Sequence, residues 1–422
     1  MMERYKAYKE SGLPWLRTIP EHWEVKRIKD IFTEISDKGY ADEPILCSTQ
    51  KFGVIPQSMY ENRIVIVNKG LENLKLVRQG NFVISLRSFQ GGIEYAHYQG
   101  IISAAYTVLQ LAKGFNEIYI KYLLKSSAFI QLLQICTTGI REGRNVNYSV
   151  LKQESLPVPP LEEQRAIAEY LDRETVRIDR IVELLTKQRE RYAQLKRSLI
   201  SEVVTHGLPH HNYTMKEANL PWLDTIPEHW EISRAKDMFK RMSRSVKETD
   251  EIITCFRDGQ VTLRKLRRKD GFTESFKEIG YQGIRKGDLV IHQMDAFAGA
   301  IGISDSDGKG TPVYICLQPI NHLYYNTYYA YLLREMASSQ FIFSLRKGIR
   351  ERSCDFRYDT FATLYLPVPP LEEQQEIVAY LDERCKRLDR LVEAIDRKIE
   401  LLGSLKKSLI EEVVTGQRRI TN

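Results

Sequence analysis

The chain has 422 residues, 43% of which are hydrophobic, and its formal net charge is +7. This length favours two or more domains, and the hydrophobic fraction excludes global disorder. A run of about 18 apolar residues is absent, which argues against a membrane span, and the polar N-terminal segment is unlike a signal peptide. The six cysteines show no CxxC spacing, which argues against a zinc ribbon or a disulfide framework. A cytoplasmic protein is therefore expected, and its moderate positive charge permits a polyanionic partner.

Two segments of the chain each occur twice. The first, LPWLRTIPEHWEVKRIKDIF, begins at Leu13 and recurs at Leu220 as LPWLDTIPEHWEISRAKDMF. The second begins with LPVPPLEEQ, at Leu156 and again at Leu366, and continues into a long helical stretch. Because matched segments are separated by nearly the same distance in both halves, the unlike stretches between them are predicted to share one fold. We call these unlike stretches the inserts.

The inserts are predicted to be mixed α/β. Short apolar runs bounded by glycine favour strands, and a longer apolar stretch near the end of each insert favours a helix. The predicted strands are Arg63–Val67, Asn81–Leu86, Ala104–Leu111, Asp288–His292 and Thr311–Leu317. The predicted helices are Asn116–Leu133 and Asn326–Phe343.

Each LPVPPLEEQ segment is predicted to start a long helix that ends at a glycine cap, Gly207 or Gly416. The prolines hold the preceding chain extended, and Glu162 and Glu163 suit the first turn, where the helix dipole favours acids. Apolar residues then recur every seven positions, as in a coiled-coil seam. The seam residues are Leu171, Ile178, Leu185, Tyr192 and Leu199, then Leu381, Leu388, Ile395, Leu402 and Leu409, with a second row at Ile181, Leu195, Leu391 and Leu405. The alternative is two amphipathic helices that each pack on their own domain.

Basic, aromatic and amide side chains gather at matched places in the inserts. Arginine can bind guanine or phosphate through its planar fork, and asparagine and glutamine can bind adenine. The matched places are the loops at Ser85–Gly92 and His292–Ala300 and the Gly-Ile-Arg-Glu segments at Gly139 and Gly348, to which a basic run at Arg264–Lys269 is added. The DNA-binding candidates are Arg87, Ser88, Gln90, Arg141, Arg144, Asn145, Tyr148, Arg264, Lys265, Arg267, Arg268, His292, Gln293, Arg350, Arg352 and Arg357. For each basic cluster the alternative is a solvated surface.

The sequence contains no recognisable catalytic motif. Neither a GxxxxGK[ST] phosphate loop nor a GxGxxG after a strand is present. Val158 and Val368 precede the Pro-Pro pairs where amino-methyltransferases have Asn or Asp. His210 and His211 lie between the two halves without nearby cysteines, which favours a plain loop. No catalytic or metal-ligating residue is therefore predicted.

The chain twice contains TIPEHW, then a variable insert, then LPVPPLEEQ before a long heptad helix. This arrangement resembles the DNA specificity subunit of type I restriction-modification systems. The resemblance covers nearly the whole chain and implies an α+β fold: two similar target recognition domains joined by two long helices that pair as an antiparallel coiled coil with pseudo-twofold symmetry. It implies the domains 1–155 and 208–365 and the spacer helices 156–207 and 366–422.

The resemblance also implies a non-catalytic subunit that reads a bipartite target in double-stranded DNA. It implies two methyltransferase subunits as partners, and motor-nuclease subunits in the restriction complex. These partners would hold the S-adenosylmethionine, ATP and magnesium sites, so no cofactor is expected on this chain and no membrane contact. At 1.5 Å per residue, Leu171 to Leu199 spans about 42 Å, roughly one turn of B-DNA. Two other functions remain open: a stand-alone nuclease or methyltransferase, and a coiled-coil scaffold without DNA contact.

Overall fold

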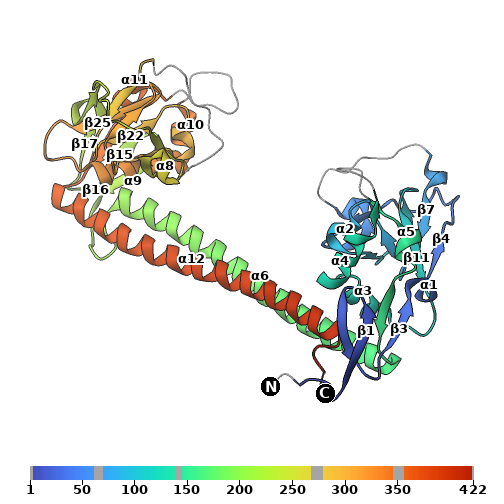
Figure 1. Cartoon of the computed structure of the whole chain (residues 1–422). Coiled ribbons are helices and arrows are strands. Elements are labelled where there is room, and N and C mark those ends of the chain that lie inside the picture. The colour runs from blue at the N-terminus through green and yellow to red at the C-terminus, as the bar shows by residue number, and fades with distance from the viewer. Residues whose placement is uncertain (1–2, 61–69, 139–144, 268–278, 346–355, 421–422) are drawn as a thin grey trace. The chain divides into compact units, whose positions relative to one another are not determined.

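The chain forms two compact units, shown in a computed structural model that describes residues 3–60, 70–138, 145–267, 279–345 and 356–420 (Figure 1). Unit 1 comprises Met1–Thr186 and Asp396–Asn422, and unit 2 comprises Lys187–Ile395. Each unit therefore holds one insert and part of both long helices. The predicted boundaries at 155, 207 and 365 stay predictions, because the compact units divide the helices instead. Among the described residues, no helix has the length and apolar character needed to cross a membrane.

Unit 1 contains many short strands and few long helices. Its strands are β1 Tyr8–Leu13, β2 Leu16–Pro20, β3 Glu24–Arg27, β4 Phe32–Ile35, β5 Leu46–Thr49, β6 Gly53–Pro56, β7 Lys75–Val77, β8 Phe82–Ile84, β9 Glu94–Tyr95, β10 Gly100–Ile102, β11 Thr107–Leu111, β12 Thr137–Thr138, β13 Asn145–Val146 and β14 Ser155–Val158. Its helices are α1 Ile28–Ile31, α2 Ser88–Gly91, α3 Glu117–Leu123, α4 Ser127–Ile135, α5 Tyr148–Leu151 and the start of α6 Leu161–His206.

Unit 2 repeats most of this order of elements, without described counterparts of β12 and β13. Its strands are β15 Met215–Leu220, β16 Leu223–Pro227, β17 Glu231–Arg234, β18 Phe239–Met242, β19 Ile253–Cys255, β20 Val261–Leu263, β21 Gln282–Ile284, β22 Leu289–His292, β23 Ile301–Ile303, β24 Gly308–Gly310, β25 Tyr314–Pro319 and β26 Tyr365–Val368. Its helices are α7 Ala235–Met238, α8 Arg264–Arg267, α9 Asn326–Ser338, α10 Phe341–Ser344, α11 Tyr358–Ala362 and the start of α12 Leu371–Val414.

A four-stranded antiparallel sheet has the same strand order in both units. The order is β4-β11-β8-β9 in unit 1 and β18-β25-β22-β23 in unit 2. Four predicted strands are therefore confirmed, with shifted ends, as β8, β11, β22 and β25, whereas the strand predicted at Arg63–Val67 lies outside the described residues. The matching order confirms that the two inserts share one fold.

Each insert helix predicted from the sequence is two helices in the structure. Between α3 and α4 the chain turns at Ser126, whose hydroxyl caps α4 by accepting from Phe129 N. Between α9 and α10 it turns at Gln340, which adopts a left-handed conformation with φ of 65°. Both pieces of each pair pack on the core of their own unit, so the apolar pattern continues across the break and hides it.

The two long helices run antiparallel within unit 1. The buried hydroxyl of Tyr119 lies 3.1 Å from the carbonyl of Pro157, before α6, and 3.3 Å from that of Val414, the last residue of α12. Further along α6 and earlier in α12, Lys406 Nζ and Asp179 Oδ1 pair at 2.7 Å. The start of α6 therefore lies beside the end of α12.

Unit 2 shows the same arrangement with the roles of the helices exchanged. The hydroxyl of Tyr328 donates to the carbonyl of Val204 near the end of α6, and its neighbour Tyr329 contacts Pro367, before α12. Lys196 Nζ and Asp389 Oδ1 pair at 2.7 Å. Both helices end as predicted at glycines with positive φ, 85° at Gly207 and 75° at Gly416.

The first predicted row of heptad residues is buried or half-buried, while most of the second row is exposed. Leu171, Ile178, Leu381, Ile395 and Leu409 are at most 8% exposed. The other first-row residues are half-buried: Leu185, Tyr192, Leu199, Leu388 and Leu402. In the second row, the exposed fraction is 53% for Leu195, 39% for Leu391 and 50% for Leu405.

The repeated sequence segments meet at one joint in unit 1. Glu163, in the first turn of α6, accepts hydrogen bonds from the hydroxyl of Tyr5 at 2.6 Å and from Trp23 Nε1 at 3.2 Å, and pairs with His22 Nε2 at 2.7 Å. The next residue, buried Gln164, accepts from Asn116 N and donates to the carbonyl of Pro159. The LEEQ and EHW motifs therefore fasten the insert to its helix.

Unit 2 forms this joint again. Glu373 pairs with His229 Nε2 at 2.7 Å and accepts from Trp230 Nε1 at 3.1 Å. Gln374 accepts from Tyr325 N and donates to the carbonyl of Pro369. The repeated motifs are thus accounted for by structure, because each supplies buried polar contacts that the joint needs.

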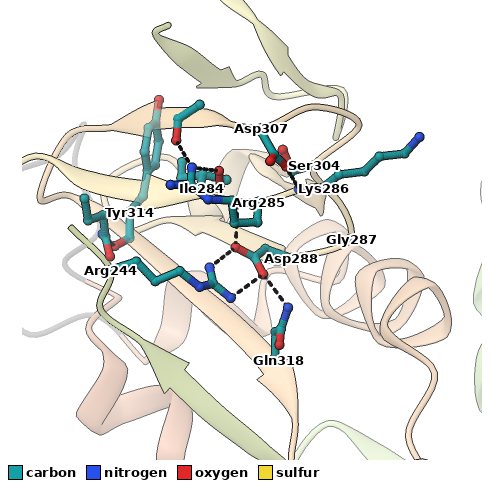
Figure 2. A network of polar contacts seen from close by, with 12 residues as sticks. Arg244, Ile284, Arg285, Lys286, Gly287, Asp288, Ser304, Asp307, Tyr314 and Gln318 are labelled. Carbon is teal, nitrogen blue, oxygen red and sulfur yellow. Dashed lines mark hydrogen bonds and ion pairs between the residues drawn. The ribbon is translucent and has the colours of Figure 1, made fainter. Parts of the chain in front are cut away.

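One corner of the sheet is stabilised differently in the two units. In unit 2, fully buried Asp288 accepts from both Nη atoms of Arg244, from Arg285 N and from Gln318 Nε2 (Figure 2). Arg285 in turn pairs with Asp250 at 3.0 Å. In unit 1 the matched positions are Asp37, Arg78 and Asn81, and the ion pair runs from Arg78 to Asp37 at 2.8 Å. The same backbone corner therefore carries unlike side chains in the two inserts.

Candidate nucleic-acid interface

The loop after β8 places two predicted residues at a hollow in unit 1. Arg87 and Gln90 are exposed and line a cavity of about 790 Å³, together with Gln50, Lys51 and Phe52 from the turn between β5 and β6. Among the described residues, no carboxylate forms an ion pair with Arg87 or Lys51. These two cations can therefore contact an anionic ligand without breaking an internal pair.

Ser88, predicted beside them, has a different position. It is 2% exposed, and its hydroxyl accepts a hydrogen bond from Ser85 N at 2.9 Å. This contact holds the turn that presents Arg87.

An ion pair lies at the base of the hollow. Glu94 on β9 lines it but is only 2% exposed, and its Oε1 pairs with Lys125 Nζ at 2.5 Å. Lys125 also donates to the carbonyl of Gly91 at 2.9 Å and contacts that of Gln50 at 3.5 Å. Burial raises the pKa of Glu94 to about 7, even though Lys125 opposes this shift. Lys125 therefore joins the three segments that form the hollow.

The Gly-Ile-Arg-Glu segment of unit 1 leads into a strand next to this loop. Asn145 is exposed on β13, which lies beside α2. Tyr148 is half-buried and packs against the core of unit 1, and burial raises the pKa of its hydroxyl. The structure thus brings Asn145 close to the helix that carries Gln90, while Arg141 and Arg144 lie outside the described residues.

The described part of the basic run of unit 2, Arg264–Arg267, forms α8, where its cations contact nearby acids and polar groups. Lys265 Nζ pairs with Glu251 at 2.6 Å and Arg267 with Asp258 at 2.5 Å. Arg264 Nε donates to the hydroxyl of Thr254. Its neighbour Arg268 lies outside the described residues. These contacts lower the net positive charge that α8 presents.

The loop after β22 holds two predicted residues in half-buried positions. His292 Nδ1 accepts from Asp295 N at 3.1 Å, and its ring lies 5.1 Å from that of Tyr314. Burial lowers the pKa of His292, which favours the neutral ring with a proton on Nε2. The backbone of Gln293 bonds to Val313 and Phe356. This loop is therefore tied down at several points.

The last group of predicted residues is only partly described. Arg357 is exposed and precedes the first turn of α11, whereas Arg350 and Arg352 lie outside the described residues. The sequence did not indicate Glu94 or Lys125, because the β9 strand has only two residues and Lys125 lies 31 residues further along the chain. The turn at Lys51 and Phe52 could have been predicted from the sequence, because Gly53 follows these two residues and short apolar runs on either side favour the two strands of a hairpin.

Two regions of the chain, residues 20–190 and 227–401, match the family model of the type I restriction modification DNA specificity domain. The MjaVIII type I restriction enzyme specificity subunit of Methanocaldococcus jannaschii is 24% identical over 100% of this chain and 99% of its own length. The EcoBI specificity subunit of Escherichia coli is 22% identical over 65% of this chain and 60% of its own length.

Two solved structures have a similar fold. One, from work on complex assembly and conformational transition of the type I R-M system, has a TM-score of 0.68 at 17% identity and covers 94% of this chain and 99% of that one. The other is the HsdS subunit of Thermoanaerobacter tengcongensis, with a TM-score of 0.54 at 17% identity, covering 94% of this chain and 98% of that one.

Proposed function

Because the chain belongs to the family of type I restriction-modification DNA specificity proteins, we propose that its two units read two unlike halves of one DNA target. The chain is a non-catalytic subunit for DNA sequence recognition. Its matched regions cover both units, so one recognition surface per unit is the simplest arrangement. The two halves of the target would be separated by base pairs that neither unit contacts.

The observation that carries this proposal is the contrast between the joints and the inserts. Glu163 and Glu373 make nearly the same contacts in the two units. By contrast, the ion pair of Glu94 with Lys125 has no equivalent in unit 2, where Gly302 takes the position of Glu94 on β23. A shared fold with unlike polar side chains supports two surfaces that distinguish different bases.

We assign residues 1–155 and 208–365 to the two recognition domains and residues 156–207 and 366–422 to the spacer helices. The antiparallel pairing of α6 with α12 within each unit supports a spacer role. A helix pair of fixed length would set the distance between the two half-sites, because the number of residues between the domains fixes the rise along the axis. The predicted DNA contacts in the inserts belong to this proposal.

The partners would be double-stranded DNA, two methyltransferase subunits and, in the restriction complex, motor-nuclease subunits. Support for two identical partners comes from Leu195 and Leu405, which occupy matched positions in the two helices and are 53% and 50% exposed. Single exposed leucines are common on protein surfaces, so it is their matched placement rather than their exposure that favours two equivalent docking sites. These partners would bind S-adenosylmethionine, ATP and magnesium, and the complex would act in the cytoplasm, where its DNA target lies.

Mapping of methylated adenines tests the proposed function. The chain is expressed with its partner subunits in a host without other adenine methylation, and the genome is read by single-molecule sequencing. The expected result is one motif with two defined halves and a fixed gap. A continuous motif would refute the two-unit arrangement, and unchanged methylation without this chain would refute the recognition role.

A further inference from the structure

A buried carboxylate oxygen without a partner lies at the base of the hollow in unit 1. Glu94 Oε2 has no hydrogen-bond partner in the described part of the chain, although the side chain is 2% exposed and lines the hollow. A buried acceptor that is left unpaired costs free energy, so natural proteins rarely keep one without a reason. A second polar atom at the same hollow, the hydroxyl oxygen of Ser48, also lacks a partner.

Lys125 cannot satisfy this oxygen. A lysine ammonium group has three N–H donors. Those of Lys125 are directed at Glu94 Oε1, the carbonyl of Gly91 and the carbonyl of Gln50. The free acceptor capacity of Glu94 is therefore built into the packing of three segments, at a residue that lines the hollow.

The rest of the hollow suits a nucleobase. Phe52 and Tyr106 line it, and aromatic side chains are the groups on which bases stack, although Lys51 Nζ lies 4.9 Å from the centre of the Phe52 ring. Arg87 and Lys51 lie at the same hollow and suit the phosphate groups on either side of a base. In its ionised form, paired with Lys125, the Glu94 carboxylate accepts hydrogen bonds only, so it distinguishes bases by whether they present a donor.

We propose that Glu94 is a specificity-determining residue of unit 1, which accepts a hydrogen bond from the exocyclic amino group of a cytosine or adenine in the first half of the target. Guanine O6 and thymine O4 are acceptors and would face the carboxylate with like partial charge. The inference rests on the proposed function and adds the chemical class of one recognised base. The amino group belongs to a base within the duplex that is approached from the major groove, because a guanine or thymine rotated out of the duplex would also present ring N–H donors.

Unit 2 cannot recognise a base in this way. Gly302 pairs with Val290 as Glu94 pairs with Val83, so the two residues occupy the same place in the sheet. A Cβ atom at Gly302 would lie 1.8 Å from the carbonyl oxygen of Gly259, which leaves no room for any side chain. The carboxylate is thus a feature of one unit, as expected for a residue that distinguishes one half-site from the other.

The test compares the methylated motifs of the wild-type chain and Glu94→Gln, each expressed with the partner subunits. We expect one C or A position in a single half of the motif to become degenerate, with methylation of mismatched sites rising on the order of ten- to a hundredfold. Glu10→Gln, an exposed substitution in β1 of the same unit, should leave the motif unchanged.

Thermal melting shows whether Glu94→Gln folds, and Glu94→Asp, which keeps the charge but moves the carboxylate, provides a second variant if it does not. If a folded variant keeps every position of a bipartite motif, the role of Glu94 is refuted while the proposed function stands. If the wild-type chain itself produces no bipartite motif, the proposed function fails first.

Discussion

Removal of the Asp288 carboxylate should destabilise unit 2 and leave unit 1 intact. Asp288 is fully buried and accepts four hydrogen bonds, two from Arg244, one from Arg285 N and one from Gln318 (Figure 2). In Asp288→Ala the guanidinium of Arg244 keeps its charge but loses its partner, and two further donors lose their acceptor. Water reaches these donors only in part, so the variant leaves them partly without hydrogen bonds in the folded state.

Asp288→Ala is expected to lower the free energy of unfolding of unit 2 by about 3 kcal/mol. Truncation of one partner of a buried ion pair costs roughly 3–5 kcal/mol. The Arg244 side chain is 22% exposed and can recover some hydration, which favours the lower end of that range. A change of about 3 kcal/mol is a large part of a domain stability of roughly 5–15 kcal/mol. It corresponds to roughly a hundredfold increase in the population of the open form of unit 2.

Hydrogen exchange measured by mass spectrometry checks this result segment by segment. Amides of β22 and β25 should exchange about a hundredfold faster in Asp288→Ala, while those of β8 and β11 stay unchanged. The matched control is Asn81→Ala in unit 1, where the side chain accepts a bond from Arg78 N at 2.8 Å. The free energy of unfolding of that variant should fall by about 1 kcal/mol. The reasoning would be refuted if the two variants lost equal amounts of unfolding free energy, or if Asp288→Ala sped up amide exchange equally in both units.

Two further results are expected from the hollow of unit 1. Arg87→Ala should weaken binding of the complex to all DNA sequences alike and reduce the slope of log affinity against log salt concentration by about 1. Lys265→Ala should change this slope less, because the ammonium of Lys265 is already paired with Glu251. A larger change of slope in Lys265→Ala than in Arg87→Ala would count against this assignment. Burial raises the pKa of Glu94 from 4.5 to about 7, so the stabilisation it gives to the folded chain is complete below pH 4.5 and is lost as the pH rises through 7. Between pH 4.5 and 7.5 the stability of the wild-type chain relative to Glu94→Gln should fall by about 2–3 kcal/mol, and a difference that is independent of pH would show that the carboxyl is not shifted.

Much of the fold could be predicted because its signals are local or repeated. The prolines before α6 and α12 and the glycines after them mark helix ends directly. The repeated LEEQ and EHW motifs indicated two equal copies, although only the structure explains why. Glu163 and Gln164 are repeated because both are hydrogen-bonded at the joint between the insert and its helix. The breaks before α4 and α10 were missed because the apolar pattern continues through them.

The candidate site was less predictable, since it depends on contacts between distant residues. Glu94 and Lys125 lie on different elements, and nothing in their local sequence indicates that they pair. The cations of α8 stood out by number, but sequence could not show that Glu251 and Asp258 lie beside them. Charge density in the sequence therefore overstated the net positive charge that α8 presents.

An exchange of one insert tests the central proposal most directly. Residues 1–155 are replaced by the corresponding segment of a related specificity subunit, and the methylated adenines of a host that expresses the hybrid with the partner subunits are mapped. The proposal predicts that one half of the motif changes to that of the donor, while the other half and the gap stay as they were. A motif in which both halves change, or in which neither does, would contradict the assignment of one half-site to each unit.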